Sequence, residues 1–306
     1  PRARRQPALP ASHGPSLLVS ELAAWEDIDL AWAVLGVGGC GTTSLAVNLH
    51  LHPELELLYT DALFEDQSFF HSSLKHPFPH PTRLEVLRFN HWTTKPAAQA
   101  GARPRRRGVK RPQYLESGLA LARLGRIPGL RAFLVVADPV AQAERGYLKN
   151  FGLCRMWNAT FRAPPLTACL RSVCMPTCTL QSGGVGRPGF SVQPWHVAGA
   201  EQVRRVVAEL GPERVFLADR SELSRGREFF ERAAAFAGAR GPFPRQTAFT
   251  TSNKASGVPR DTPALRADLR RRGGRRAEVL HEEGLARLRQ ALAEERQALR
   301  DWFARL

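Results

Sequence analysis

A glycine-rich stretch, GVGGCGTTSL from Gly36 to Leu45, constrains the fold more than any other feature of this sequence. The apolar run 30–37 before it is typical of a short buried strand, and residues 44–52 after it show a helical pattern that stops at Pro53. Glycines allow the tight turn that such a connection needs. The order strand, glycine turn, helix therefore predicts a βα unit, whose turn is either an ordinary structural connection or a binding site.

The residues of this turn are those expected of an anion-binding site. A helix start carries unpaired N–H groups and the positive end of the helix dipole, and hydroxyl side chains add further donors. The candidate residues are Gly38, Gly39, Cys40, Gly41, Thr42, Thr43 and Ser44. A Walker phosphate loop is excluded because no lysine precedes the final hydroxyl pair. A dinucleotide-binding fingerprint is poorly met, because Asp61 is the sole acidic residue near the place that the fingerprint requires.

Further strand and helix patterns alternate along the chain. Strands are predicted at 54–60, 130–136 and 214–219, and helices at 115–127, 201–211 and 226–238. This alternation predicts an α/β fold, specifically a three-layer α/β/α sandwich around a central, mainly parallel sheet. Residues 1–28, rich in Pro, Ala and Arg, are predicted to be a basic tail, and residues 29–306 the domain. We expect loops at Arg103–Arg107 and 162–188, and one long amphipathic helix near the C-terminus, within 277–306.

Charge restricts the class of partner. The 306 residues include 44 Lys and Arg against 28 Asp and Glu, which gives a formal net charge of +16. Such a chain favours anionic partners: a nucleotide, a nucleic acid, an acidic glycan or an anionic membrane surface. No apolar run reaches the roughly 18 to 20 residues of a membrane span. Because the sequence begins with Pro, we expect a processed or truncated start, and any signal or anchor would lie upstream.

Five cysteines leave three interpretations open. They are Cys40, Cys154, Cys169, Cys174 and Cys178. Four of them can form two disulfides in a secretory or luminal protein, with Cys40 as the odd residue, or all five can be cytosolic thiols. A metal cluster of the last three is the third interpretation, but no second Cys/His pair supports zinc, and we expect no metal.

Three segments resemble PAPS-dependent sulfotransferases of the heparan-sulfate and other glycan-modifying type. The turn with Gly41, Thr42, Thr43, Ser44 and Leu45 resembles the family's 5′-phosphosulfate loop, which reads roughly PKxGTTSL. GVKRPQYLES at 108–117 resembles ExKTPxYF, and FLVVADPVAQAERGYLKN at 133–150 resembles the segment that carries the 3′-phosphate site. The later RVFLADRSEL and the helix after it also resemble the family's pattern, so the resemblance covers about 30–306.

The resemblance implies specific residue roles. Lys110 matches the lysine of the second motif and is expected to neutralise charge at the sulfuryl group. Asp61, with Glu65 as second choice, stands where the family has its catalytic base, although Asp61 is equally well read as a strand-end turn or cap. Lys254 falls in a segment that closes over the nucleotide in the family. The resemblance implies PAPS as co-substrate and a hydroxyl or amino group of an acidic or neutral glycan as acceptor. It also implies the Golgi lumen as the location, with a membrane anchor upstream.

The motifs also depart from the family. Gly39 occupies the place of the loop lysine, Ala137 that of the arginine at the 3′-phosphate, and Arg145 that of a serine in the following helix. We expect Arg145 to reach the 3′-phosphate and Lys110 to compensate for the lost lysine. Removal of one cation from such a site costs about 2 to 4 kcal/mol of transition-state stabilisation, or roughly a 30- to 1000-fold slower reaction.

These departures keep rival hypotheses open. The first hypothesis is a sulfotransferase, and the second is a catalytically impaired sulfotransferase-like domain that binds a nucleotide or polyanion. A nucleic-acid binder is supported by charge alone, and we expect no specific nucleic-acid partner. The basic runs at Arg103–Arg107 and Arg270–Arg276 are candidate contacts for an acidic glycan, or simply solvated loops. Trp92, Trp157 and Trp195 are candidate sugar-stacking residues, with core packing as the alternative.

Overall fold

The computed structural model describes residues 21–36, 40–60, 70, 80–95, 104–142, 159–162, 177–180, 199–250, 267 and 282–306. The chain divides into two compact units. Unit 1 comprises Pro1–Val136, Gln202–Ser252 and Leu306, and unit 2 comprises Ala137–Glu201 and Asn253–Arg305. The sheet and the glycine-rich turn therefore belong to unit 1.

Unit 1 is built on a five-stranded sheet in the order β2-β3-β1-β4-β7, and every pairing in it is parallel. The strands are β1 (Trp32–Gly36), β2 (Leu55–Leu58), β3 (Arg106–Lys110), β4 (Arg131–Val136) and β7 (Val215–Asp219). The predicted α/β fold with a parallel sheet is confirmed. Three of the five strands are the apolar runs recognised in the sequence and a fourth, β2, is the centre of the run 54–60, as expected for strands covered on both faces.

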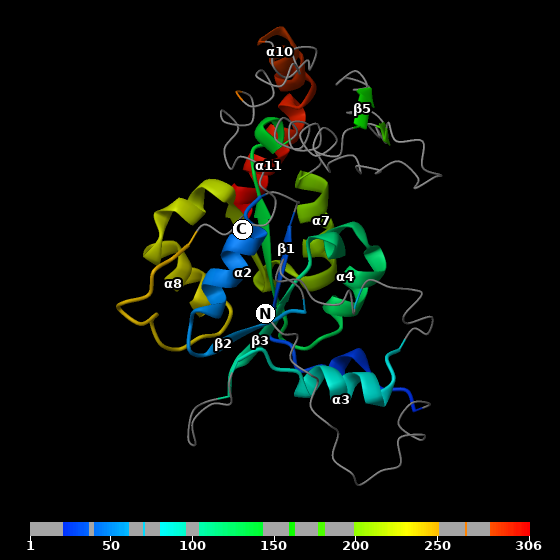
Figure 1. Ribbon diagram of the computed structural model, residues 1–306, viewed down its shortest axis with the longest axis vertical. Coiled ribbons are helices and arrows are strands. Elements are labelled where there is room, and N and C mark those ends of the chain that lie inside the picture. Colours follow the sequence, from blue (N-terminus) through cyan, green and yellow to red (C-terminus); the bar gives the residue numbers. More distant parts are fainter. Residues whose placement is uncertain are drawn as a thin grey trace. The chain divides into compact units, whose positions relative to one another are not determined.

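Helices flank this sheet (Figure 1). Helices α2 (Thr42–His50) and α8 (Arg227–Phe236) lie on one side, and α4 (Gly118–Gly125) and α7 (Gly199–Leu210) on the other. A Cβ atom at Gly125 would lie 2.9 Å from the backbone oxygen of Glu209, so α4 and α7 pack closely there. Helix α2 begins two residues before the predicted start, which places Thr42 and Thr43 inside its first turn. Short 3-10 helices η1 (Trp25–Asp27), η2 (Pro112–Glu116), η3 (Pro212–Arg214) and η4 (Arg220–Arg225) complete this unit together with α3 (Arg83–His91).

The prediction that Arg103–Arg107 forms a loop is wrong for its last two residues. Arg106 and Arg107 begin β3, one of the three inner strands. The next residue, Gly108, lies under the indole of Trp32, where a Cβ atom would be 2.0 Å from the ring. The Trp32 indole N–H donates to the Arg106 carbonyl at 3.1 Å. The strand was not predicted because two of its five residues are arginines, and hydropathy does not indicate that a guanidinium will be buried.

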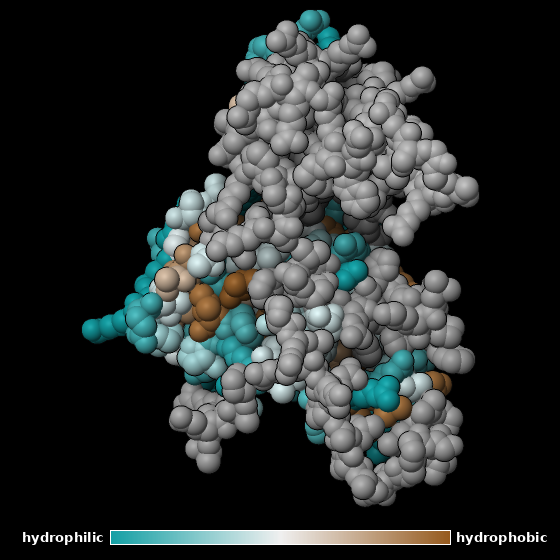
Figure 2. Space-filling view, viewed as in Figure 1, coloured by the Kyte–Doolittle hydropathy of each residue, from teal (hydrophilic) through white to brown (hydrophobic). Residues whose placement is uncertain are grey.

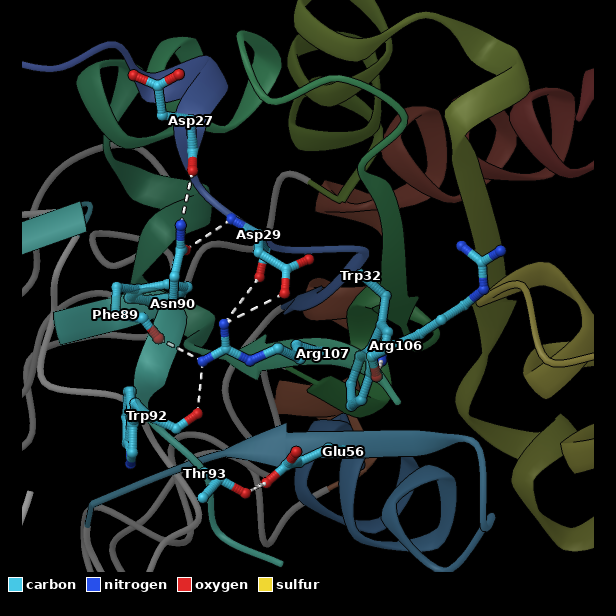
Figure 3. A network of polar contacts seen from close by, with 10 residues as sticks. All are labelled: Asp27, Asp29, Trp32, Glu56, Phe89, Asn90, Trp92, Thr93, Arg106 and Arg107. Carbon is cyan, nitrogen blue, oxygen red and sulfur yellow. Dashed lines mark hydrogen bonds and ion pairs between the residues drawn. The ribbon is translucent and has the colours of Figure 1, made fainter. Parts of the chain in front are cut away.

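Arg107 is buried because its guanidinium is satisfied by backbone carbonyls (Figure 3). It donates to the carbonyl oxygens of Phe89 and Trp92, at the end of α3, and forms an ion pair with Asp29 at 3.5 Å. Its charged group also lies 5.7 Å from the centre of the Phe89 ring. A buried arginine is tolerated only when its donors find such partners. Arg107 therefore attaches α3 to β3.

Residues 93–95 cover the outer edge of β2. The Thr94 hydroxyl donates to the Leu57 carbonyl at 2.5 Å, and the Lys95 ammonium donates to the carbonyls of His52 and Leu55. The same segment surrounds the Glu56 carboxylate, which accepts from the Thr93 hydroxyl (Figure 3). It also accepts from the backbone N–H groups of Thr94 and Lys95. Burial alone would raise the pKa of Glu56, but these hydrogen bonds outweigh burial and hold the pKa below its usual range. The exposed strand edge is thus satisfied without another strand.

His50 completes this edge from the last turn of α2. Its Nδ1 accepts from the Leu57 backbone N–H at 2.9 Å, which requires an unprotonated nitrogen. Burial, reinforced by the nearby positive charges of Lys95 and Arg105 and opposed by Glu56, lowers the pKa of His50 to about 4. The imidazole therefore stays neutral in the native protein at neutral pH.

Part of the predicted tail belongs to the packed unit. Trp25 is fully buried and Ile28 is 3% exposed, and Leu22 forms a β-bridge with Thr82. The Trp25 ring packs on Phe70, and the Arg123 guanidinium lies 4.9 Å from its centre. Residues 21–28 are thus part of unit 1, because the buried Trp25 anchors them. The prediction of a tail failed because it relied on the Pro- and Ala-rich composition of residues 1–28 and not on this one aromatic residue.

Unit 2 has its own elements. Strands β5 (Ala159–Arg162) and β6 (Thr177–Leu180) pair antiparallel, and helices α10 (Glu282–Ala291) and α11 (Ala293–Arg305) replace the single long helix expected near the C-terminus. The Glu295 carboxylate accepts from the Ala200 backbone N–H at 2.6 Å. Arg296 forms an ion pair with Asp138 at 2.6 Å. Helix α11 is thereby tied to the residues that follow β4.

The described surface is largely hydrophilic or neutral with small hydrophobic areas on the face drawn in Figure 2. The large apolar side chains that are exposed, Leu22, Leu51, Leu119 and Leu306, are distant from one another in the sequence. Within the ranges that the structure describes, no helix has the length and apolar character to cross a membrane.

Replacement of Arg107 by leucine should destabilise the protein by about 2 to 4 kcal/mol, because two buried carbonyls and Asp29 lose their donor. Urea unfolding followed by circular dichroism measures this loss. Arg126→Leu is the matched control, since its ion pair with Glu26 is exposed, with 43% and 41% side-chain exposure, and should change stability by no more than ~1 kcal/mol. Equal losses in the two variants would contradict the structural role of Arg107.

The low pKa of His50 predicts an acid-sensitive fold. The unfolded chain takes up a proton near pH 6.5 and the folded chain only near pH 4, so stability is lost as the pH falls through this window. The contribution of His50 is roughly 1 to 3 kcal/mol. In His50→Asn the amide oxygen replaces Nδ1 as acceptor but does not titrate. Unfolding free energies between pH 7 and pH 4 should therefore fall less steeply in this variant, and parallel curves would exclude His50 as the titrating group.

Candidate functional site: the carboxyl edge of the parallel sheet

Four neighbouring strands of unit 1 end at one edge of the sheet, because all of them are parallel. The register sets Val34 of β1 beside Lys110 of β3, and Gly36 of β1 beside Val135 of β4. On the far side, Val136 of β4 pairs with Asp219 of β7. In open α/β sheets, ligands bind outside this carboxyl edge, where the connections leave the strands. The predicted glycine-rich turn leaves from β1, in the middle of it.

Gly36 allows β1 and α2 to approach each other. Its φ is +138°, and a Cβ atom there would lie 2.7 Å from the Val135 carbonyl oxygen and 2.8 Å from Cγ2 of Thr42. A side chain at this position would collide with both the neighbouring strand and the first turn of the helix. The helix start is consequently held directly against the sheet.

Helix α2 begins without a side-chain cap. Gly41 occupies the N-cap position in the left-handed conformation, with φ +97°, and has no side chain that could cap the first turn. Thr42 follows and is 4% exposed, yet its hydroxyl makes no hydrogen bond to any residue of the described ranges. Cys40 and Ser44 are also buried. A helix start without a capping side chain at its N-cap, followed by a buried threonine whose hydroxyl has no partner among the described residues, is chemically suited to receive an anion.

Lys110 brings a cation to the same edge. It is the last residue of β3 and is 2% exposed. Gly36 faces α2, Val34 lies two residues before it on the same face, and Lys110 is paired with Val34. Because side chains alternate along a strand, the Lys110 side chain stands on the face that carries α2. The structure thus brings the predicted lysine and the predicted helix start to one side of one sheet edge.

The connection after β7 also reaches this place, which sequence reasoning missed. The 3-10 helix η4 packs over Gly41, where a Cβ atom would be 2.4 Å from Cδ1 of Leu223 and 4.0 Å from Cγ of Arg220. Asp219 fixes the start of η4 by accepting from the Ser221 backbone N–H at 2.7 Å. Residues 219–222, Asp-Arg-Ser-Glu, form a recognisable capping box, with Asp219 at the N-cap and Glu222 three residues later. This local signal does not reveal that η4 packs on the start of α2.

The residues after β4 begin unit 2. Asp138 caps a helical turn by accepting from the backbone N–H groups of Val140 and Ala141, as the Asp-Pro sequence predicts. Ala137 is 7% exposed, and its methyl group has no polar function. A role for Ala137 in binding is thus restricted to its backbone.

Several predicted site residues lie outside the described residues: Gly38, Gly39, Asp61, Glu65, Arg145 and Lys254. The same holds for Cys154, Cys169, Cys174, Cys178, Trp157, Trp195 and the basic run Arg270–Arg276. The described segment 199–250 ends at Thr250, which forms two hydrogen bonds with Asn48 of α2. Its amide donates to the Thr250 carbonyl at 2.8 Å and accepts from the Thr250 N–H at 2.9 Å. Asn48 is buried and was not singled out in the sequence.

Comparison with known proteins finds similarity to solved structures alone. No protein-family model and no curated protein matches it. Among solved structures it is similar to a sulfotransferase from Alicyclobacillus acidocaldarius, with 17% identity and a TM-score of 0.47, over 82% of this chain and 94% of that one. It is also similar to the sulfotransferase domain from the curacin biosynthetic pathway, with 15% identity and a TM-score of 0.40, over 74% of this chain and 81% of that one. At such low identity, what this chain does has to follow from its own residues.

Gly41→Ala should destabilise the protein by several kcal/mol, because the methyl group adds a collision with Leu223 to the strain of a left-handed alanine. Gly129→Ala is the matched control. Gly129 has φ +67° with no atom within 4 Å of its Cβ position, so its substitution adds only the backbone strain of about 1 kcal/mol. Thermal unfolding compares the two variants. Equal losses would show that η4 does not press on Gly41.

Proposed function

We propose that this chain is a sulfotransferase that uses PAPS and transfers the sulfuryl group to a hydroxyl or amino group of a carbohydrate. The uncapped start of α2, held against the sheet by Gly36, is the observation that carries the proposal. It coincides with the sequence segment that resembles the phosphosulfate loop. Lys110, in the second resembling segment, stands on the same face at the next strand end. Two separate resemblances thus fall on adjacent strands at one edge.

Sulfuryl transfer requires three changes in bonding. The acceptor O–H or N–H must lose its proton, its oxygen or nitrogen must form a bond to sulfur, and the bond from sulfur to the 5′-phosphate oxygen must break. Adenosine 3′,5′-bisphosphate (PAP) then leaves with the electron pair of that bond. The N–H groups and hydroxyls at the start of α2 are suited to hold the phosphate as charge accumulates on it, and the Lys110 ammonium is suited to stabilise that charge.

The remaining roles follow from the resemblance. Asp61 is proposed as the base that takes the acceptor proton, with Glu65 as second choice. The backbone at Ala137 and the side chains of Arg145 and Lys254 are proposed to bind the 3′-phosphate and the nucleotide. The net charge of +16 favours an acidic glycan as acceptor and gives no preference for a nucleic-acid sequence. The Golgi lumen stays our proposal for the location, with a membrane anchor upstream.

A second candidate function is nucleotide or polyanion binding without catalysis. The replacement of a loop lysine by Gly39 and of an arginine by Ala137 favours it, since both changes remove charge from the phosphate-binding segments. Calorimetric titration with PAP and an assay with ³⁵S-labelled PAPS against a glycan panel separate the two. Binding with transfer supports the enzyme, binding without transfer to any acceptor supports the second candidate, and absence of PAP binding contradicts both for the nucleotide.

Lys110→Met should slow sulfuryl transfer roughly 30- to 1000-fold, because methionine keeps most of the buried volume but removes the charge beside the leaving phosphate. Single-turnover rates with saturating PAPS measure the effect. Lys95→Met is the control: Lys95 is half-buried, and its ammonium donates to the carbonyls of His52 and Leu55. It should lower stability and leave the transfer rate unchanged. Equal rates in Lys110→Met and wild type would remove Lys110 from the reaction.

A further inference from the structure

We propose that Arg220, from the connection after β7, is the cation that holds the 5′-phosphate end of the nucleotide in place of the missing loop lysine. This inference rests on the proposed function and adds a binding residue to it. The lysine position of the loop is Gly39, so a positive charge is missing from the chain segment where the resemblance expects one. The structure places another positive charge beside the same helix start.

The position of Arg220 is fixed by packing. Leu223, one turn further along η4, lies where any side chain on Gly41 would have to be, and Cγ of Arg220 is 4.0 Å from that same Cβ position. Three further bonds separate Cγ from the guanidinium carbon, so the charged group can reach the first turn of α2. Both residues belong to unit 1, and β7 is parallel to β4 and β1, so their carboxyl ends share one edge.

The charge of Arg220 is not neutralised by the acidic residues near it. Asp219 accepts from the backbone and hydroxyl of Ser221. Glu222 is engaged by Arg232 at 3.1 Å and by Arg225 at 3.8 Å. Arg220 itself is partly buried and has no hydrogen bond or ion pair with any residue in the described part of the chain. A partly desolvated guanidinium without a partner is the group that gains most from an incoming anion.

A second observation points to a ligand at this place. Thr42, at the same helix start, is 4% exposed as a residue, and its hydroxyl has no hydrogen-bond partner among the described residues. An anion there would accept from Thr42 and from the uncapped first turn, while Arg220 would add a bidentate, charge-assisted contact. The connection after β7 would thus provide the positive charge that the glycine-rich loop lacks in its own sequence.

Calorimetric titration of Arg220→Gln with three adenosine phosphates tests this assignment. Affinity for PAP and for adenosine 5′-phosphate should fall about 10- to 100-fold, the effect of one charge-assisted contact. Adenosine 3′-phosphate, which has no 5′-phosphate, should bind wild type and variant alike. Arg220→Lys should recover part of the affinity. Arg225→Gln, on the same 3-10 helix but 56% exposed and close to Glu222, should bind all three ligands as wild type does.

The outcomes separate this inference from the proposed function. If wild type binds PAP and Arg220→Gln binds it equally well, the nucleotide site stands and the role of Arg220 is overturned. An equal loss for the 3′- and 5′-phosphates would also overturn it, since it would indicate a general structural defect, which melting temperatures would reveal. If wild type binds no PAP, the proposed function fails. Titration of wild type and Arg220→Gln with pyrophosphate then tests the anion site itself. Weaker binding to Arg220→Gln than to wild type supports Arg220 as an anion-binding residue, whereas equal binding or no binding overturns this inference too.

Discussion

The close approach of β1, β4 and α2 at Gly36 is the constraint on which the rest of the site depends. A strand that ends in the middle of a parallel sheet must turn its chain out of the sheet without pushing away its neighbour. At Gly36 a side chain would meet the Val135 carbonyl oxygen at 2.7 Å, so only a residue without Cβ allows β1 to end there. The same absence lets Thr42 pack against the strand. The helix start is thereby placed at the sheet edge, with no capping side chain at its N-cap residue, Gly41.

Several arginines of the described chain hold the fold together, whereas Arg220 stands at the carboxyl edge of the sheet. Arg107 uses its donors on backbone carbonyls and Asp29, and Arg227 and Arg232 are paired with Glu231 and Glu222. Arg220 lies among these residues without such a partner in the part of the chain that the structure describes. A high net charge by itself predicts only a preference for anions. The position of Arg220 beside Gly41 gives that preference a location at the sheet edge.

Sequence reasoning reached the sheet, the glycine-rich turn and the direction of the strands, because these depend on local patterns. Apolar runs such as 130–136 identify buried strands, and glycines beside hydroxyl residues identify the turn. It failed at β3, where Arg106 and Arg107 suggest solvent, because burial of a guanidinium depends on carbonyls contributed by a distant helix. Helix α3 was also missed, although Thr82 and Glu85 form a capping box that a search for that signal would have found. The contact of η4 with Gly41 depends on the order of strands in the sheet, which no local pattern encodes.

The topology explains how the proposed phosphate site can lack a lysine in its loop and still carry a positive charge. In a parallel sheet, connections that are far apart in sequence meet at one edge, so a cation can be supplied by any strand end that lies near the turn. Lys110 ends β3 on one side of β1, and Arg220 follows β7, two strands away on the other side, where η4 returns to pack on Gly41. Lys110 is held by its strand, and Arg220 by its place after β7 and by the packing of Leu223 on the same 3-10 helix. Charges fixed in this way need little reorganisation when negative charge develops on a leaving phosphate, and preorganisation of that kind is the main electrostatic contribution to catalysis.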